Sequence, residues 1–288
     1  MSVNSRAALR AILSEDVAYA VPGVYDGLSA RCAMRSGFPV VHATGAGISC
    51  SLGYPDLGLI TMTEVLQRVR EICTAVEVPL IADADTGYGN VINMRRTVRE
   101  FEQAGAAGIH IEDQKSPKKC GQLSGKHVEP VEEMMQKIRA AVAARSDPDF
   151  VIIARTDARE ILGLEEVIRR CRAYFEAGAD AVFPMALEGE GEVVAVGREA
   201  PGPKMITATH GGKTPSLGLG RFGALGYRFV VYAMSPMLVA AHALQEALTA
   251  IRRDGTDAAV SGQMLNFKQL YDLVDIEAYE AWDQRFNA

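Results

Sequence analysis

Residues 101–111 read FEQAGAAGIHI, and residues 175–184 read FEAGADAVFP. Both stretches lead from the end of an amphipathic helix, through a small-residue stop that contains glycine, into a short apolar strand. The same order recurs along the chain, where eight apolar runs begin near residues 17, 40, 79, 108, 150, 180, 204 and 228. Strands that alternate with helices in this way predict a parallel sheet covered by helices.

Eight such units predict an α/β fold of the (β/α)8 TIM-barrel type. The chain has 288 residues, and a barrel of this type commonly uses about 250. A doubly wound open sheet is the alternative, but residues 22–27, PGVYDG, do not form the glycine-rich phosphate turn GxGxxG. We find no linker, and we therefore expect a single domain over residues 1–288. We expect its C-terminal helical segment, at about residues 262–288, to serve in packing or oligomerisation.

Composition and charge indicate which classes of partner this protein has. The net charge is −6 and the pI is about 5.5, which argues against nucleic-acid binding. The longest apolar segment, residues 229–251, is interrupted by Ser235-Pro236 and predicts a buried strand followed by a helix, not a membrane span. The five cysteines show neither disulfide nor zinc spacing, so we expect a cytoplasmic protein.

Carboxylates follow two neighbouring strands of the predicted barrel, at the rim that carries active sites. Asp83 and Asp85 are two residues apart and face the same way. Such a pair repels unless a cation or a proton lies between the two groups. Glu112 follows the next strand in the same register as His110. These residues favour an Mg²⁺ site, although one aspartate could instead cap the following helix.

Two further strand ends carry polar groups. Arg155 could bind a substrate carboxylate, or it could form an internal ion pair with Glu112 or Asp157. The turn HATGAGIS, residues 42–49, exposes backbone N–H groups that could bind a carboxylate, or it could be an ordinary turn. The histidines near these ends are expected to orient neighbours and not to bind metal: His42, His110 and His210.

A single thiol, Cys120, lies in the segment EDQKSPKKCGQLSGKHVEP, residues 112–130. Nearby ammonium groups favour a thiolate, so we expect Cys120 to be the most reactive thiol of the chain. The alternative is a surface loop with an incidental cysteine. Three other cysteines lie in amphipathic helices, where we expect burial: Cys32, Cys73 and Cys171.

These motifs resemble the isocitrate lyase/phosphoenolpyruvate mutase superfamily. The match is strongest to its small carbon–carbon lyases of the methylisocitrate lyase, dimethylmalate lyase and petal-death types. It covers nearly the whole chain and rests on SLGYPDLGLIT, DADTGYGN, AGAAGIHIEDQ, KKCG, DPDFVIIARTDA, AGADAVFP and GGKTP. The KKCG loop is specific to the lyase branch.

The resemblance implies a barrel whose last helix is swapped between subunits of a homodimer or homotetramer. It implies Mg²⁺, with Mn²⁺ as an alternative, held mainly through Asp85, while Asp56, Asp83 and Glu112 act largely through waters. The substrate carboxylate is expected to meet Arg155 and the turn of Thr44, Gly45 and Ala46, with Tyr25 and His110 also at the substrate. Lys118, Cys120 and Gly121 match a gating loop in which Cys120 is the acid/base thiol.

The chain departs from the family at four positions. Gln122, Met185, Thr207 and His210 stand where family lyases have His, Glu, Asn and Glu, so we expect an altered pocket for the leaving half of the substrate. We therefore predict a lyase that releases pyruvate, or a close 2-oxo acid, from a malate-like or citrate-like 2-hydroxy acid. Two alternatives remain: an oxaloacetate hydrolase, decarboxylase or phosphonate-type enzyme, and a catalytically silent binding protein.

Overall fold

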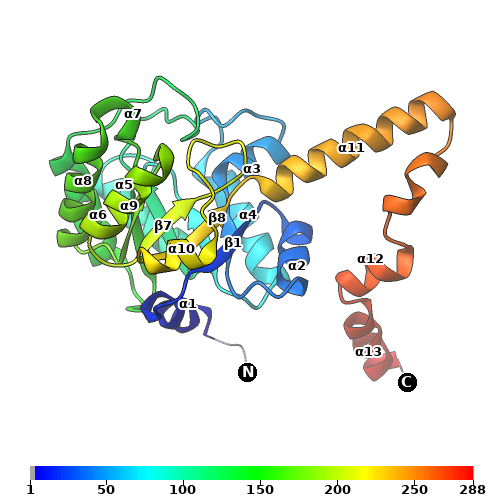
Figure 1. The fold of residues 1–288 in the computed structure, drawn as a ribbon. Coiled ribbons are helices and arrows are strands. Elements are labelled where there is room, and N and C mark those ends of the chain that lie inside the picture. Colours follow the sequence, from blue (N-terminus) through cyan, green and yellow to red (C-terminus); the bar gives the residue numbers. More distant parts are fainter. Residues whose placement is uncertain (1–3, 288) are drawn as a thin grey trace.

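Eight parallel strands close into a barrel in chain order, and β1 pairs with β8 to complete it (Figure 1). The computed structural model describes residues 4–287. The strands are β1 Tyr19–Val24, β2 Val41–Ala43, β3 Leu80–Asp83, β4 Gly108–Glu112, β5 Val151–Thr156, β6 Ala181–Pro184, β7 Lys204–Thr207 and β8 Tyr227–Tyr232. The predicted (β/α)8 barrel is confirmed, because each strand lies within or beside one of the eight apolar runs.

Helices surround the barrel (Figure 1). They are α1 Ser5–Ser14, α2 Gly27–Arg35, α3 Gly45–Ser51, α4 Met62–Ala75, α5 Val91–Gln103, α6 Val131–Ala144, α7 Arg159–Leu162, α8 Leu164–Glu176, α9 Gly189–Glu199 and α10 Leu219–Ala224. The two repeated stretches end their helices as predicted. Gly105 follows α5 with φ +98° and Gly178 follows α8 with φ +106°, a backbone region that side chains disfavour.

Alternation along each strand places one set of apolar residues inside the barrel and another under the helices. Ile81, Val151 and Ile153 belong to the inner cluster. Ile109 and Ile152 belong to the outer cluster, which packs against the helices. The inner register ends in polar residues at the carboxyl ends of the strands, because Asp83 continues the parity of Ile81 and Arg155 that of Ile153. The fold therefore collects its polar groups at one rim.

The C-terminal part of the chain leaves the barrel as an arm (Figure 1). It consists of α11 Ser235–Asp254, the 3-10 helix η1 Ala258–Gln263, α12 Phe267–Leu273 and α13 Ile276–Asn287. Asp275 of the arm forms ion pairs with Arg31 at 2.9 Å and Arg35 at 2.6 Å, both on α2. The arm exposes large apolar side chains, among them Leu248 and Phe267, which are 64% and 78% exposed. The predicted C-terminal segment is thus the end of a longer arm that begins at residue 235.

Within residues 4–287, none of the helices combines the length and the apolar character that crossing a membrane requires.

Candidate active site

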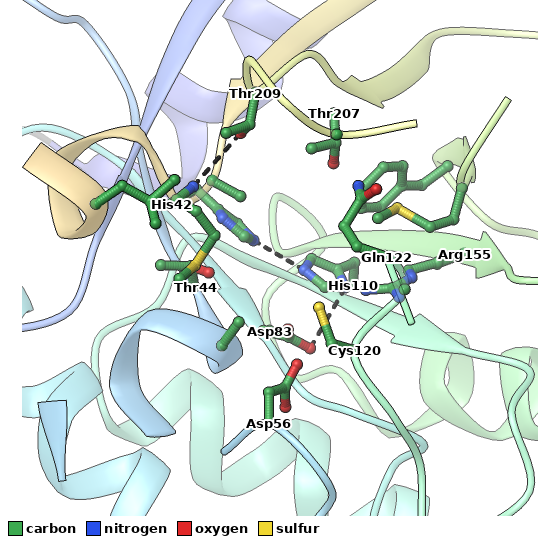
Figure 2. A pocket seen from close by; sticks show the side chains of 18 of the residues that line it. His42, Thr44, Asp56, Asp83, His110, Cys120, Gln122, Arg155, Thr207 and Thr209 are labelled. Atoms are coloured by element: carbon green, nitrogen blue, oxygen red, sulfur yellow. Dashed lines mark hydrogen bonds and ion pairs between the residues drawn. The ribbon is translucent and has the colours of Figure 1, made fainter. Parts of the chain in front are cut away.

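A cavity of about 250 Å³ opens at the carboxyl ends of the strands (Figure 2). Twelve residues predicted from the sequence to belong to the site line it: Thr44, Ala46, Asp56, Asp83, His110, Cys120, Gly121, Gln122, Arg155, Met185, Thr207 and His210. Four others lie directly behind this lining, where each contacts a lining residue: Gly45, Asp85, Glu112 and Lys118. Tyr25 is the exception, because it does not line the cavity and packs beside Gly47 of α3.

Asp83 is fixed by the backbone around it. Its Oδ1 accepts a hydrogen bond of 3.0 Å from the N–H of Asp85, and its Oδ2 accepts one of 3.3 Å from Gly45. A Cβ at Gly45 would lie 2.6 Å from Oδ2, so only glycine fits this approach. Asp85 adopts φ +48°, a left-handed conformation that is uncommon outside glycine and often marks a functional site.

The ammonium of Lys118 lies between two carboxylates of the rim. Its Nζ is 2.6 Å from Oδ1 of Asp56 and 2.8 Å from Oδ1 of Asp85, and its side chain is 5% exposed. Burial raises the pKa of Asp85 to about 6, while Lys118 opposes that rise. Across the part of the chain that the structure describes, no three His, Cys, Asp or Glu side chains are grouped to hold a metal. The three-carboxylate metal site therefore stays a prediction.

Glu112 is fully buried, and its carboxylate lacks hydrogen-bond partners. Nη1 of Arg155 lies 3.1 Å from its Oε2, but neither of its oxygens accepts a hydrogen bond within residues 4–287. Burial raises the pKa of Glu112 well above its ordinary value. A buried, unsatisfied carboxylate calls for a further polar partner, and the waters around a divalent ion would supply one. In this respect the residues present fit the predicted ion.

Arg155 forms both internal ion pairs that the sequence analysis gave as an alternative, with Glu112 and with Asp157. Its Nε and Nη2 donate to Asp157 at 2.8 Å and 3.1 Å, and its guanidinium lies 5.5 Å from the ring centre of Phe183. Asp113 supports this arrangement from behind, because its Oδ1 accepts a 2.9 Å hydrogen bond from the N–H of Asp157. Arg155 nevertheless borders the cavity, so it could still contact a substrate carboxylate, and that contact stays a prediction.

Two buried imidazoles face each other at the floor of the cavity (Figure 2). Nε2 of His42 and Nε2 of His110 are 2.8 Å apart, so one donates and the other accepts. Burial lowers the pKa of His42 to about 3 and that of His110 to about 4, which keeps both rings neutral. Nδ1 of His110 lies 3.6 Å from Oδ1 of Asp83. The orienting role of both histidines stays a prediction.

The segment with Cys120 lies folded over the cavity. The N–H of Cys120 donates a 2.9 Å hydrogen bond to the carbonyl of Asp56, and Gly121 packs against Arg155 and Met185. Burial raises the pKa of the Cys120 thiol above its ordinary value. Lys118 lowers this pKa, as we expected of the lysines, but burial outweighs its effect. Carboxylates engage the two buried lysines of the segment, Lys118 and Lys126, and the high reactivity of Cys120 stays a prediction.

The expected burial of the other cysteines holds only in part. Cys171 is buried and Cys73 is half-buried, whereas Cys32 is exposed, contrary to our expectation. Cys32 lies on the side of α2 that faces away from the barrel, as its buried neighbours Ala30 and Ala33 show. The helix α2 is short and has few large apolar residues, so the periodicity of its sequence could not predict which side is buried.

The side of the cavity away from the carboxylates is largely apolar. This side is formed by Phe183 of β6 and by Met185, which follows that strand. It continues with Ala233 and Met234, just before α11, and with Leu238 in its first turn. The polar residues of this side are neutral or exposed: Gln122, Thr207, Thr209 and His210. Sequence reasoning missed Met234 and Leu238, because a residue at the start of a helix carries no signal of the cavity beneath it.

Comparisons with known proteins agree with this geometry. The family model described as phosphoenolpyruvate phosphomutase matches residues 9–252. The chain is 44% identical over 276 residues to 2,3-dimethylmalate lyase of Eubacterium barkeri, covering 96% of each chain. It is 38% identical over 275 residues to 2-methylisocitrate lyase of Bacillus subtilis, covering 96% of this chain and 91% of that protein.

Solved structures are similar over their whole length. An oxaloacetate acetylhydrolase in complex with the inhibitor 3,3-difluorooxalacetate superimposes with a TM-score of 0.94 at 35% identity, covering 100% of this chain and 99% of the other. A phosphonopyruvate hydrolase in complex with oxalate and Mg²⁺ superimposes with a TM-score of 0.90 at 33% identity, covering 99% and 100%.

The close approach at Gly121 leads to a prediction. A Cβ at this position would lie 2.6 Å from Nη2 of Arg155 and 2.6 Å from Cε of Met185, so Gly121→Ala should prevent the Cys120 segment from seating. Overpacking of this kind costs about 1–3 kcal/mol. Limited trypsin digestion should then cleave after Lys118 or Lys119 roughly tenfold faster than in the wild type.

Leu123→Ala is the matched control, because Leu123 lies in the same segment with its side chain 45% exposed. Equal cleavage rates in wild type and Gly121→Ala would show that the segment does not depend on this contact.

Proposed function

This chain belongs to the phosphoenolpyruvate mutase/isocitrate lyase superfamily, and from that premise we propose that it is a carbon–carbon lyase. It cleaves a malate-like 2-hydroxy acid by a retro-aldol step into pyruvate, or a close 2-oxo acid, and a carboxylate. The observation that carries this proposal is the position of Cys120. Its thiol, whose pKa burial raises, is held over a cavity that has buried carboxylates on one side and an apolar wall on the other, with Arg155 at the edge of that wall.

The 2-oxo-acid half is proposed to bind at the charged side. The N-terminal turn of α3, with Thr44, Gly45 and Ala46, lies at this side, and Arg155 offers its guanidinium. The N–H groups of Thr44 and Gly45 already donate to Val24 and Asp83, so a substrate carboxylate would meet the N–H of Ala46 first. Arg155 cannot swing freely, because Asp157 and Glu112 hold it. A fixed donor favours one orientation of a carboxylate and thereby sets which carbon–carbon bond faces Cys120.

We propose Mg²⁺ as the cofactor, with Mn²⁺ as an alternative. Asp85 is the principal ligand, and Asp56, Asp83 and Glu112 act largely through waters. Two observations support this assignment: the unsatisfied oxygens of Glu112 and the cation position that Lys118 now takes between Asp56 and Asp85. When bound, the ion supplies positive charge to the oxygens of the 2-oxo-acid half.

Cys120 is proposed to supply the final proton. The substrate hydroxyl loses its proton to the carboxylate cluster, the C2–C3 bond breaks, and its electron pair enters the departing half as a carboxylate enediolate. The carbon of that enediolate takes the proton from the Cys120 sulfur. A thiol whose pKa is raised by burial still carries this proton at neutral pH, and the charges of Arg155 and Lys118 favour the thiolate that remains.

The departing half is proposed to carry an alkyl group and not an additional carboxylate. Met185 is buried and offers an adaptable apolar surface. Met234 and Leu238 extend that surface, whereas Arg155 lies at its edge, close to Met185 and Phe183, and already pairs with Glu112 and Asp157. A second carboxylate placed against Met234 and Leu238 would lose its water without gaining a cation of its own.

One other activity has a specific observation in its favour. The cavity lies in a fold close to that of an oxaloacetate acetylhydrolase, so hydrolysis or decarboxylation of oxaloacetate is the second candidate. A phosphonate-type reaction is less favoured, because the thiol of Cys120 lines the cavity and is proposed to protonate an enediolate there.

We further propose a homodimer or homotetramer in the cytoplasm. The apolar face of the arm is uncovered in one chain, and a second copy of this chain would cover it. The five cysteines are unpaired, as suits a reducing compartment. Sedimentation equilibrium should give a mass at least twice the 31.0 kDa of one chain. A chain that ends at residue 234 should sediment as smaller species or fail to fold, whereas a monomeric full chain would contradict the proposal.

The metal assignment can be tested without turnover. Asp85→Ala should abolish Mg²⁺-dependent oxalate binding, measured by calorimetry, while circular dichroism stays unchanged. Because burial raises the pKa of Asp85 to about 6, wild-type affinity should fall about tenfold for each pH unit below 6, where protons compete with the ion. Glu132→Ala, on the exposed face of α6, is the control. Undiminished binding in Asp85→Ala would remove this residue from the site.

Substrate choice tests the lyase proposal itself. Pyruvate or glyoxylate release should be compared for 2,3-dimethylmalate, citramalate, isocitrate, 2-methylisocitrate and oxaloacetate at equal Mg²⁺, with Cys120→Ser as the blank. We expect an alkyl-substituted malate to have the highest kcat/KM and 2-methylisocitrate to be slower by roughly 10²- to 10⁴-fold. The highest kcat/KM on 2-methylisocitrate would refute the apolar-wall argument.

The same panel separates the alternatives. The highest rate on oxaloacetate would establish the second candidate. No turnover of any acid, together with intact oxalate binding, would identify a silent binding protein.

A further inference from the structure

Three separate segments of the rim meet at one carboxylate, that of Glu160. Its Oε2 lies 2.9 Å from Nζ of Lys126 and 3.3 Å from Nζ of Lys213. Its Oε1 accepts a 3.2 Å hydrogen bond from the N–H of Gly125. Glu160 belongs to α7 after β5, Gly125 and Lys126 to the Cys120 segment after β4, and Lys213 to the loop after β7.

Lys126 connects this carboxylate to the turn that holds the thiol. Its Nζ donates to the carbonyl of Gly121 at 2.9 Å and to that of Leu123 at 2.7 Å. The residue is 3% exposed, so its charge lies out of water. Within residues 4–287, the only ion pair that it forms is the one with Glu160.

A second contact joins the same segments. Oε1 of Gln122 accepts a 2.9 Å hydrogen bond from the N–H of Lys213. The Cys120 segment is thus fastened to the β7 loop directly through Gln122 and indirectly through Glu160 and Lys213. Both fastenings lie outside the carboxylate cluster, and Glu160 does not line the cavity.

We propose that Glu160 is a positioning residue that latches the Cys120 segment over the cavity and sets how long it stays closed. The reason is the cost of a buried charge without a partner. If Glu160 loses its charge, the ammonium of Lys126 is left buried and uncompensated, and the chain relieves that cost by opening the segment to water. Opening exposes Cys120 and releases what the cavity holds.

The charge of Glu160 is secure in the physiological range. The hydrogen bond from Lys126 is the main cause that lowers its pKa to about 2, so the carboxylate stays ionised. The ion pair between Glu160 and Lys126 therefore persists through ordinary changes of pH, and the segment opens only when another group takes the place of one partner. The latch deepens the proposed function, since the segment that it holds carries the thiol proposed to deliver the proton.

Alkylation of Cys120 measures opening without any substrate. Wild type and Glu160→Gln should be treated briefly with iodoacetamide, and the modification rate of each cysteine should be followed by peptide mapping. We expect Cys120 in Glu160→Gln to react roughly tenfold faster, while the buried Cys171 reacts at its wild-type rate. Glu165→Gln changes an exposed glutamate on the neighbouring helix α8 and should leave the Cys120 rate unchanged.

A second set of variants tests the pairing itself. Lys126→Met should also speed alkylation, because it removes both carbonyl contacts. The double variant Glu160→Gln with Lys126→Met should then react about as fast as Lys126→Met alone, since the unpaired charge is gone. Lys213→Met should have a smaller effect than Glu160→Gln, because Lys213 is a quarter exposed.

Three results would overturn the latch. They are an unchanged Cys120 rate in Glu160→Gln, a parallel rise at Cys171 that indicates global loosening, and rates that multiply in the double variant. None of them involves turnover. Failure of the proposed lyase reaction would instead appear in the substrate panel, with the alkylation results unaffected.

Discussion

A carboxylate that leaves water needs positive charge nearby, and this constraint organises the whole rim of the barrel. The ends of β3, β4 and β5 bury Asp83, Glu112 and Asp157 within one small region. Arg155 forms ion pairs with Glu112 and Asp157, and Lys118, in the segment that follows β4, forms one with the neighbouring Asp85. Lys118 belongs to the segment with Cys120, so the ion pairs that neutralise Asp56 and Asp85 also hold this segment against the rim.

The same constraint explains the state of the thiol. Lysines beside a cysteine lower its pKa when their charges are free to act on it. Here Asp56 and Asp85 take up Lys118, and Glu160 takes up Lys126, so burial decides the pKa of Cys120. A raised pKa is what the proposed role of Cys120 as a proton donor requires. That chemistry suits the protonation of a carbanion-like fragment, and it does not suit covalent catalysis by a thiolate.

Sequence reasoning predicted the parts of this arrangement that follow from periodicity. Alternation along the strands was enough to place Asp83, His110 and Arg155 at one rim, and the helix stops were enough to predict the barrel. It could not predict which cation meets which carboxylate, because loops of similar composition can fold over the rim in many ways. Lys126 and Glu160 are 34 residues apart in the chain, and no local pattern joins them. Tyr25 lies outside the cavity lining, beside Gly47 of α3, so its contact with the substrate stays a prediction.

The start of the arm links the cavity to the outside of the molecule. Met234 and Leu238 form part of the apolar wall, and the helix that carries them runs away from the barrel with its remaining apolar side chains uncovered. Leu238 is 54% exposed although it borders the cavity, so no residue among 4–287 of the same chain shields its outer side. Whatever covers α11 also fixes the position of this wall. In the proposed enzyme, the fit of an alkyl group against Leu238 therefore depends on the same burial of apolar surface that would hold two chains together, so the proposed substrate preference and the proposed assembly both rest on α11.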